Sequence, residues 1–72
     1  MLIHVNETTW IHTADVQKIY VSHTKFRGNS RFFVNIETDG EIVANCFNDK
    51  AAAITEANKL ADIINRVEDE MS

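Results

Sequence analysis

The residues from His23 to Arg31, HTKFRGNSR, hold three of the seven Lys and Arg residues of the chain and one of its two glycines. The side chains in this stretch that suit an anion or a nucleotide are those of Lys25, Phe26, Arg27, Ser30 and Arg31. The basic groups supply charge, the hydroxyl group a donor, and the aromatic ring a surface on which a base can stack. A chain that turns at Gly28 and Asn29 also directs backbone amides towards a phosphate group. These residue types predict a binding loop for a small anion or a nucleotide.

The same composition is typical of an exposed hairpin tip. Glycine, asparagine, serine and long charged side chains are common at turns, because they tolerate or stabilise turn geometry. The stretch matches no defined phosphate-binding motif. A binding loop and a solvated hairpin tip are therefore both retained as interpretations of residues 23–31.

Other side chains with reactive groups are few and scattered. The chain has three His and one Cys, and they form no metal-binding spacing pattern. A thiol nucleophile at Cys46 needs a nearby base and a group that stabilises the thiolate, and the sequence identifies neither. A nucleophile elbow and a zinc signature are also lacking. We therefore predict no catalytic residues, no metal and no cofactor, and a protein that is not an enzyme.

Length and charge limit the function classes further. The 72 residues are enough for one small domain, spanning 1–72, with a single core and little room for a deep pocket. The net charge is −4, which argues against a general duplex-DNA binder, because such affinity comes from Lys and Arg that neutralise phosphates. No apolar stretch approaches the length of a membrane span, and no signal-peptide pattern begins the sequence. We expect a cytoplasmic protein without a membrane partner.

Hydrophobic periodicity divides the chain into short strands and a helix. The strands are expected at residues 2–5, 9–12, 16–24, 32–38 and 41–47. Asn48 or Asp49 then caps a helix that runs to about Glu70 and carries an apolar stripe at three- and four-residue spacing. These elements predict an α+β domain, in which an antiparallel β-meander of four to five strands has one long C-terminal helix packed on one face.

Asp39 and Gly40 mark the clearest turn, because Asp-Gly between two β-rich runs is a strong signal for a two-residue hairpin loop. Such a loop fixes which residues of the flanking strands lie opposite each other, whereas a longer bulged loop would shift them. With the two-residue loop, the core-facing pairs are Ile36 with Val43, Val34 with Asn45, and Phe32 with Phe47.

The opposite face of this hairpin is too apolar for a freely solvated surface. It carries Phe33, Ile42, Ala44 and Cys46 beside Asn35 and Glu37. The helix stripe is also wider than one small sheet requires. Both observations predict that these apolar surfaces are covered by a further contact, most simply by self-association. The alternative is that the strands curl and bury these groups internally. Trp10 and Tyr20 are amphipathic aromatic residues that form either edges of the core, the more common role, or anchors for a partner. With these two added, the expected interface residues are Trp10, Tyr20, Phe33, Ile42 and Ala44.

A pattern of strand and turn residues runs through WIHTADVQKIYVSHT…RFFVNIETDGEIVANCFNDKAAAITEANKLADII. It consists of an early short strand, "I…(D)V..I.V", a strand that ends in "DG", a further strand, and "(F)…K..A" at the start of the helix. The pattern resembles a loose family of small bacterial and phage-borne proteins, and the FlbD-type flagellar proteins have a similar outline. The resemblance implies a compact accessory protein of bacterial, phage or prophage origin that acts by binding, in the host cytoplasm if phage-encoded. It carries over no catalytic residue.

Two hypotheses about function follow. The first is a non-enzymatic binding protein, a homodimer or larger assembly that engages another protein, for example to inhibit or regulate a host factor. The second is a small protein that binds an anion or a nucleotide through residues 23–31. The expected partners are accordingly a second copy of the chain, an unidentified protein and, under the second hypothesis, a nucleotide.

Overall fold

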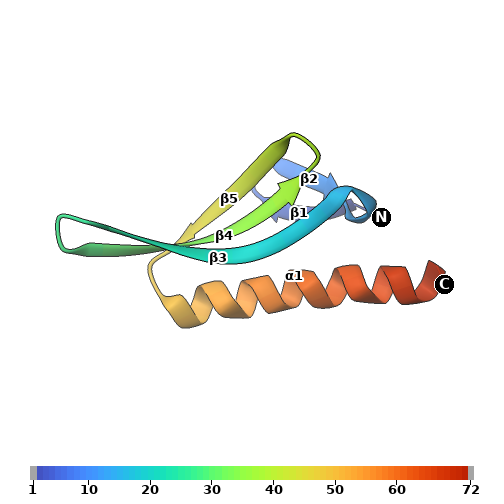
Figure 1. The fold of residues 1–72 in the computed structure, drawn as a ribbon. Helices are drawn as coiled ribbons and strands as arrows, with labels where there is room; N and C mark the ends of the chain where they lie inside the picture. Colours follow the sequence, from blue (N-terminus) through green and yellow to red (C-terminus); the bar gives the residue numbers. More distant parts are fainter. Residues whose placement is uncertain (1, 72) are drawn as a thin grey trace.

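The computed structural model describes the backbone of residues 2–71 and the side chains of residues 2–66. Its elements in chain order are β1 (Leu2–Asn6), β2 (Thr9–His12), a short 3-10 helix (Thr13–Asp15), β3 (Val16–Phe26), β4 (Asn29–Thr38), β5 (Glu41–Phe47) and α1 (Lys50–Met71) (Figure 1). The predicted α+β class, with an antiparallel β-meander and one C-terminal helix packed against it, is confirmed. Within residues 2–71, no helix combines the length and the apolar composition that crossing a membrane requires.

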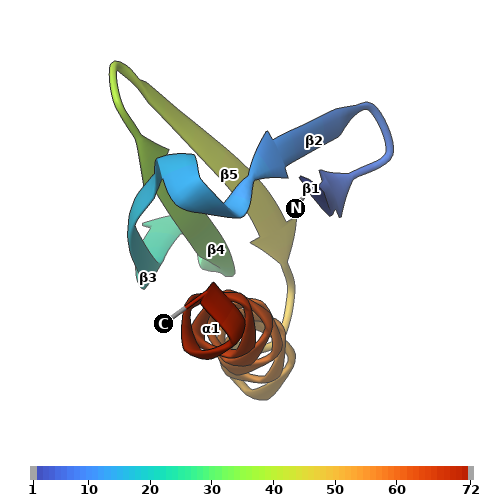
Figure 2. The same cartoon turned by 90° about the vertical axis from the view of Figure 1, so that its right-hand side faces the viewer.

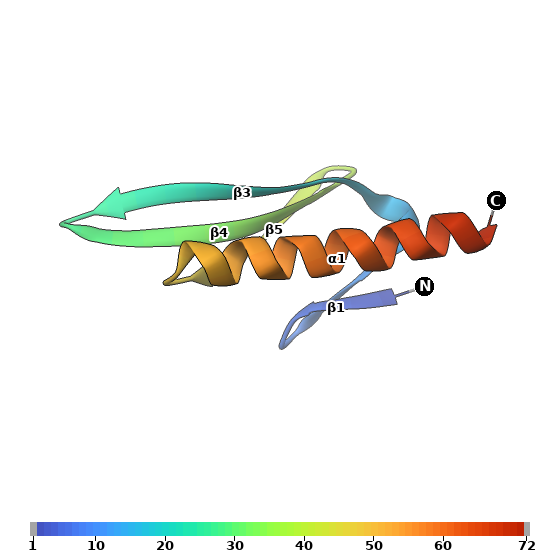
Figure 3. The ribbon, with the colours of Figure 1, turned by 90° about the horizontal axis from the view of Figure 1, so that it is seen from below.

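The strands form two sheets, whereas the sequence suggests a single meander. β1 pairs only with β2, and β3, β4 and β5 form a separate three-stranded sheet with β4 in the middle. The 3-10 helix at Thr13–Asp15 separates the two sheets in the chain. Figures 2 and 3 show α1 running along the three-stranded sheet, with the β1–β2 hairpin beside it.

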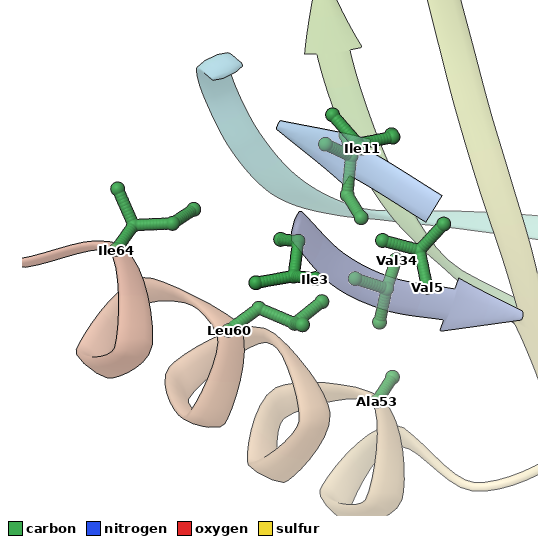
Figure 4. Packing of buried hydrophobic residues seen from close by; sticks show 8 residues of the cluster. Ile3, Val5, Ile11, Val34, Ala53, Leu60 and Ile64 are labelled. Atoms are coloured by element: carbon green, nitrogen blue, oxygen red, sulfur yellow. The ribbon is translucent and has the colours of Figure 1, made fainter. Parts of the chain in front are cut away.

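The core lies between α1, the β1–β2 hairpin and one face of the β3–β4–β5 sheet, here called the inner face. Its buried side chains are Ile3, Val5, Ile11, Val34, Ile36, Ala53, Leu60 and Ile64 (Figure 4). Val34 and Ile36, on the middle strand, are 0% exposed. Because the hairpin packs in the same cluster as α1, it covers part of the wide helix stripe. The width of that stripe is therefore no argument for self-association.

The β4–β5 hairpin has the predicted register. Its core-facing partners are Phe32 with Phe47, Val34 with Asn45, and Ile36 with Val43. Thr38 pairs with Glu41, so the loop consists of Asp39 and Gly40 alone. Gly40 has a φ of 90°, a value that side chains with a Cβ atom disfavour.

Replacing Gly40 with alanine is expected to lower the free energy of unfolding by about 1–2 kcal/mol, because a positive φ is strained for any residue with a Cβ atom. A Cβ atom at Gly40 would meet nothing within 4 Å, so the cost comes from the backbone alone. Urea unfolding followed by circular dichroism measures it. Asp39→Ala is the matched control in the same loop, and an equal loss in both variants would contradict the explanation.

The predicted loop at residues 23–31 is wrong in its extent. β3 continues to Phe26 and β4 begins at Asn29, so only Arg27 and Gly28 form the turn. Both have positive φ values, 50° and 79°, as the type I′ turn of a two-residue hairpin requires. β5 ends opposite Phe32, so residues 23–31 form a two-stranded ribbon that projects past the rest of the sheet (Figure 1). We call these residues the β3–β4 ribbon.

The start of α1 agrees with the predicted cap. The backbone N–H of Ala51 donates a hydrogen bond of 3.2 Å to the Asp49 carboxylate, which identifies Asp49 as the capping residue. The backbone N–H of Ala53 donates to the Asp49 carbonyl oxygen at 3.1 Å. The connection from β5 to α1 is therefore short, because only Asn48 and Asp49 lie between the two elements.

Candidate functional site

The outer face of the three-stranded sheet is the side opposite the inner face. The helix and the β1–β2 hairpin both pack in the inner core, so the outer face is open within the part of the chain that the structure describes. Cross-strand partners point to the same face, and successive residues alternate between faces. The register therefore assigns to the outer face Lys18, Tyr20, Ser22, Thr24, Arg31, Phe33, Asn35, Glu37, Ile42, Ala44 and Cys46. Four of the five predicted interface residues lie together here: Tyr20, Phe33, Ile42 and Ala44.

The apolar groups of the outer face are accessible, and they are most exposed on β5. Ile42 is 58% exposed, and Ala44 and Cys46 are exposed beside it. Tyr20 and Phe33 are partly buried by their neighbours in the sheet. The outer-face side chains of β5 are therefore exposed and apolar. Ile42 and Ala44 are not buried internally by curled strands, which was the alternative to self-association.

Asn35 lies in the middle of the outer face and is only 7% exposed. Its side-chain amide donates a 2.9 Å hydrogen bond to the Ser22 hydroxyl. The carbonyl oxygens of Phe33 and Tyr20 lie 3.3 and 3.4 Å from the same nitrogen. The Asn35 amide and the Ser22 hydroxyl, the central polar groups of this face, are therefore hydrogen-bonded within the sheet.

The five predicted anion-binding residues lie on two sides of the β3–β4 ribbon. Lys25 pairs with Ser30, and Thr24 pairs with Arg31. Because neighbouring pairs in an antiparallel ladder point to opposite faces, Lys25 and Ser30 lie on one side of the ribbon and Arg31 on the other. One phosphate group on one side of the ribbon therefore cannot contact all three.

The tip of the ribbon is open to solvent. Phe26 is 67% exposed, and the Arg27 guanidinium group lies 5.2 Å from the centre of its ring. The Arg31 guanidinium group donates a long hydrogen bond of 3.5 Å to the carbonyl oxygen of Ser30. These contacts agree with a solvated hairpin tip. Anion or nucleotide binding by the ribbon stays a prediction, with its residues divided between two faces.

Trp10, the fifth predicted interface residue, lies apart from the other four. It pairs with His4 in the β1–β2 hairpin, and the two rings stack with their centres 4.6 Å apart. Trp10 is 56% exposed. It borders a groove of about 400 Å³, whose lining includes the acidic residues Asp15, Asp39 and Glu41. The chain therefore offers two surfaces, the outer face of the three-stranded sheet and the surface around Trp10 on the β1–β2 hairpin.

The histidines are distributed over different environments. His4 stacks on Trp10, and His23 stacks on Phe32 with ring centres 4.6 Å apart. His12 pairs with Leu2 across the β1–β2 hairpin. In the described part of the chain, no three His, Cys, Asp or Glu side chains lie close enough together to hold a metal ion.

Asn45 has a structural role that the sequence reasoning missed. It lies on the inner face of β5, and its side-chain amide donates a hydrogen bond to the carbonyl oxygen of Val5. This bond ties the β1–β2 hairpin to the three-stranded sheet. The signal in the sequence is a polar residue at an inner-face position, between Val43 and Phe47, where an apolar side chain is expected.

No known protein family, no curated protein and no solved structure shows a significant match to this chain.

Proposed function

We propose that the chain is a non-enzymatic binding protein that functions as a homo-oligomer, in which a second copy covers the outer face. The observation that carries this proposal is the open apolar surface of that face, where Ile42 is 58% exposed beside Ala44 and Cys46. Burying an isoleucine side chain contributes about 1.5–3 kcal/mol. In a two-fold interface every contact occurs twice, so each apolar side chain contributes twice per dimer.

The side chains that the outer face presents favour a protein partner over a small molecule. Small-molecule sites are concave and present a few directed polar groups. Here the central polar groups, Asn35 and Ser22, are hydrogen-bonded to each other. What the face presents outward is apolar area, which suits the core of an interface between proteins.

The charge distribution favours a second copy of the chain as the occupant. β3, β4 and the turn between them carry Lys18, Lys25, Arg27 and Arg31, and the chain has no Asp or Glu from Val16 to Ile36. All eleven acidic residues therefore lie elsewhere, with only three basic ones. A molecule that is basic in one part and acidic in another is electrostatically complementary to itself.

The surface around Trp10 supports the second part of the proposal, that the oligomer engages another protein. Trp10 is large, amphipathic and held in place by the stack with His4, and Leu2 on the same hairpin is 54% exposed. Tryptophan is the residue type most enriched among the side chains that dominate binding energy at protein interfaces. An accessory protein that regulates its target through this surface fits the resemblance to small binding proteins.

Replacing Ile42 with aspartate is expected to convert the oligomer to a monomer, with an increase in the dissociation constant of about a hundredfold or more. In a two-fold interface the aspartate carboxylates of both copies would have to be buried, and the burial free energy of both isoleucine side chains would be lost. Sedimentation equilibrium over a range of protein concentrations measures the change.

The matched control is Ile54→Asp on α1, because Ile54 is also a partly exposed isoleucine, at 40%, but does not lie on the outer face. It should leave self-association unchanged. A wild-type protein that is monomeric, or an Ile42→Asp variant that associates like the wild type, would refute the proposed function.

A further inference from the structure

The groove beside Trp10 runs along the free edge of β2. All four residues of this strand, Thr9–His12, line the groove. Successive residues of a strand point to opposite faces, so a groove that every residue of the strand lines runs along its edge rather than over one face. β2 pairs with β1 along one edge, and no strand in residues 2–71 pairs with its other edge. The groove therefore borders backbone N–H and C=O groups that no neighbouring strand engages.

The other side of the groove is the turn end of the β4–β5 hairpin. Thr38, Glu41 and Val43 line it there, together with Asp39 of the turn. Thr38 pairs with Glu41, and Val43 pairs with Ile36 of the core, so these side chains belong to the inner face. The groove has a volume of about 400 Å³ and lies between the two sheets. A segment that paired with the free edge of β2 would contact the inner-face side chains at this end.

The charged side chains of the groove, apart from the histidine of β2, are acidic. Asp15, Asp39 and Glu41 line it, and no Lys or Arg of residues 2–66 does. Lys18, on the adjacent strand β3, lies on the outer face, where its ammonium group is 4.9 Å from the centre of the Tyr20 ring. The ion pair identified among the side chains of residues 2–66 involves none of the three carboxylates. Their charges are therefore complementary to a basic segment.

Trp10 adds an aromatic surface to these carboxylates. One face of its ring stacks on His4, with ring centres 4.6 Å apart, and the residue is nevertheless 56% exposed. The stack holds the indole ring in place and leaves the rest of it open. A Lys or Arg cation within about 6 Å of a tryptophan ring is attracted by the negative face of the ring. The groove thus combines two kinds of group that bind basic side chains.

We propose that the groove between β2 and the β4–β5 turn binds an extended basic segment of a partner protein, which adds to the free edge of β2 as a further strand. In this mode of binding, main-chain hydrogen bonds provide affinity and the alternate side chains provide specificity. The inference rests on the proposed function, in which the surface around Trp10 engages another protein. It adds the conformation of the bound segment and its chemistry, with Lys or Arg side chains beside the carboxylates and the indole ring.

The fluorescence of Trp10 tests binding directly, because Trp10 is the only tryptophan of the chain. The probe is the peptide Lys-Val-Arg-Val-Lys, capped at both ends, which alternates basic and β-forming residues. The matched control peptide is Glu-Val-Glu-Val-Glu. The basic peptide is expected to change the emission of the wild-type protein with a dissociation constant below about 1 mM, and the acidic peptide is not. No saturable change, or an equal change with both peptides, would overturn the inference.

Removing carboxylates tests where the basic peptide binds. Asp39→Asn combined with Glu41→Gln preserves side-chain size and a turn sequence, Asn-Gly, that suits a two-residue hairpin. This double variant is expected to raise the dissociation constant of the basic peptide at least about tenfold. Glu7→Gln, in the exposed turn of the β1–β2 hairpin outside the groove, is the control and should change it less than about twofold. Equal effects would indicate attraction by net charge alone and would refute the groove as the site.

Methylation of peptide nitrogens tests the addition to the edge of β2. In an added strand, alternate residues direct their N–H groups towards the neighbouring strand, and the others direct theirs away. One peptide therefore carries N-methyl groups on its two valines, and a second carries them on the arginine and the last lysine. One of the two is expected to bind at least about tenfold more weakly than the other. Equal affinities would refute the added strand.

Two further variants identify the occupant and separate this inference from the proposed homo-oligomer. If the emission of the protein alone changes with its concentration and Arg27→Glu abolishes this change, the ribbon of a second copy fills the groove and a separate partner is refuted. Ile42→Asp alters the outer face, so it should bind the basic peptide like the wild type. If Ile42→Asp is monomeric but the wild type does not bind the peptide, self-association stands and this inference fails. If the peptide binds to a wild type that is monomeric, the homo-oligomer fails and the groove is supported.

Discussion

Replacing Leu60 with alanine is expected to lower the free energy of unfolding by about 2–5 kcal/mol. Leu60 is 2% exposed and lies between α1 and Ile3 of the β1–β2 hairpin (Figure 4). Its truncation leaves a cavity where the helix, the hairpin and the sheet meet. A domain of this length has a total stability of only about 4–11 kcal/mol, so the variant loses a large part of it. Urea unfolding followed by circular dichroism measures the effect.

Ile54→Ala is the matched control on the same helix, because Ile54 is 40% exposed and a smaller loss is expected there. Both variants should be compared at one protein concentration, or in an Ile42→Asp background, because association stabilises the folded state by mass action. A loss at Leu60 no larger than that at Ile54 would show that the helix does not pack as described.

Replacing Asn45 with alanine is expected to cost about 1–3 kcal/mol, because the buried carbonyl oxygen of Val5 then loses its side-chain donor. Val5 is 6% exposed, so water does not readily replace the lost donor. The loss of protection against hydrogen exchange should differ between parts of the molecule. Hydrogen exchange is expected to accelerate most at the β1–β2 amides, which this bond holds to the sheet, and less at β4. Mass spectrometry of deuterium uptake in peptides measures the difference.

Asn29→Ala provides the control for that experiment. Asn29 is exposed at the start of β4, so removing its amide should leave both the stability and the exchange of β1–β2 unchanged. Equal acceleration in all strands of the Asn45→Ala variant would indicate general destabilisation and would contradict a specific tether between hairpin and sheet.

The parts of the fold that depend on neighbouring residues could be predicted from the sequence. The loop at Asp39 and Gly40 determined the register of β4 and β5, because a two-residue hairpin leaves one pairing. That register in turn brought Phe33, Ile42 and Ala44 to one face. The prediction for Asp49 as helix cap rested on equally local chemistry.

The parts that depend on distant contacts could not be predicted. Alternation of apolar and polar residues identifies a strand but not its partner. The local pattern therefore did not show that β1 and β2 form a sheet of their own. For the same reason it did not show that Trp10, on β2, lies off the outer face. Asn29 and Ser30 are typical turn residues. They lie in β4 because Phe26 and Lys25 pair with them, and the turn falls one position earlier, at Arg27 and Gly28.

The topology has a consequence for how the chain folds. Every pair of neighbouring strands in the two sheets is also adjacent in sequence, so the pairing steps close short loops, and such hairpins form within about 1–10 μs. Low contact order of this kind favours fast folding. The hydrogen bond from Asn45 to Val5, by contrast, joins residues 40 positions apart. The docking of the β1–β2 hairpin therefore closes a much longer loop than any of the strand pairings, and it costs more conformational entropy than they do.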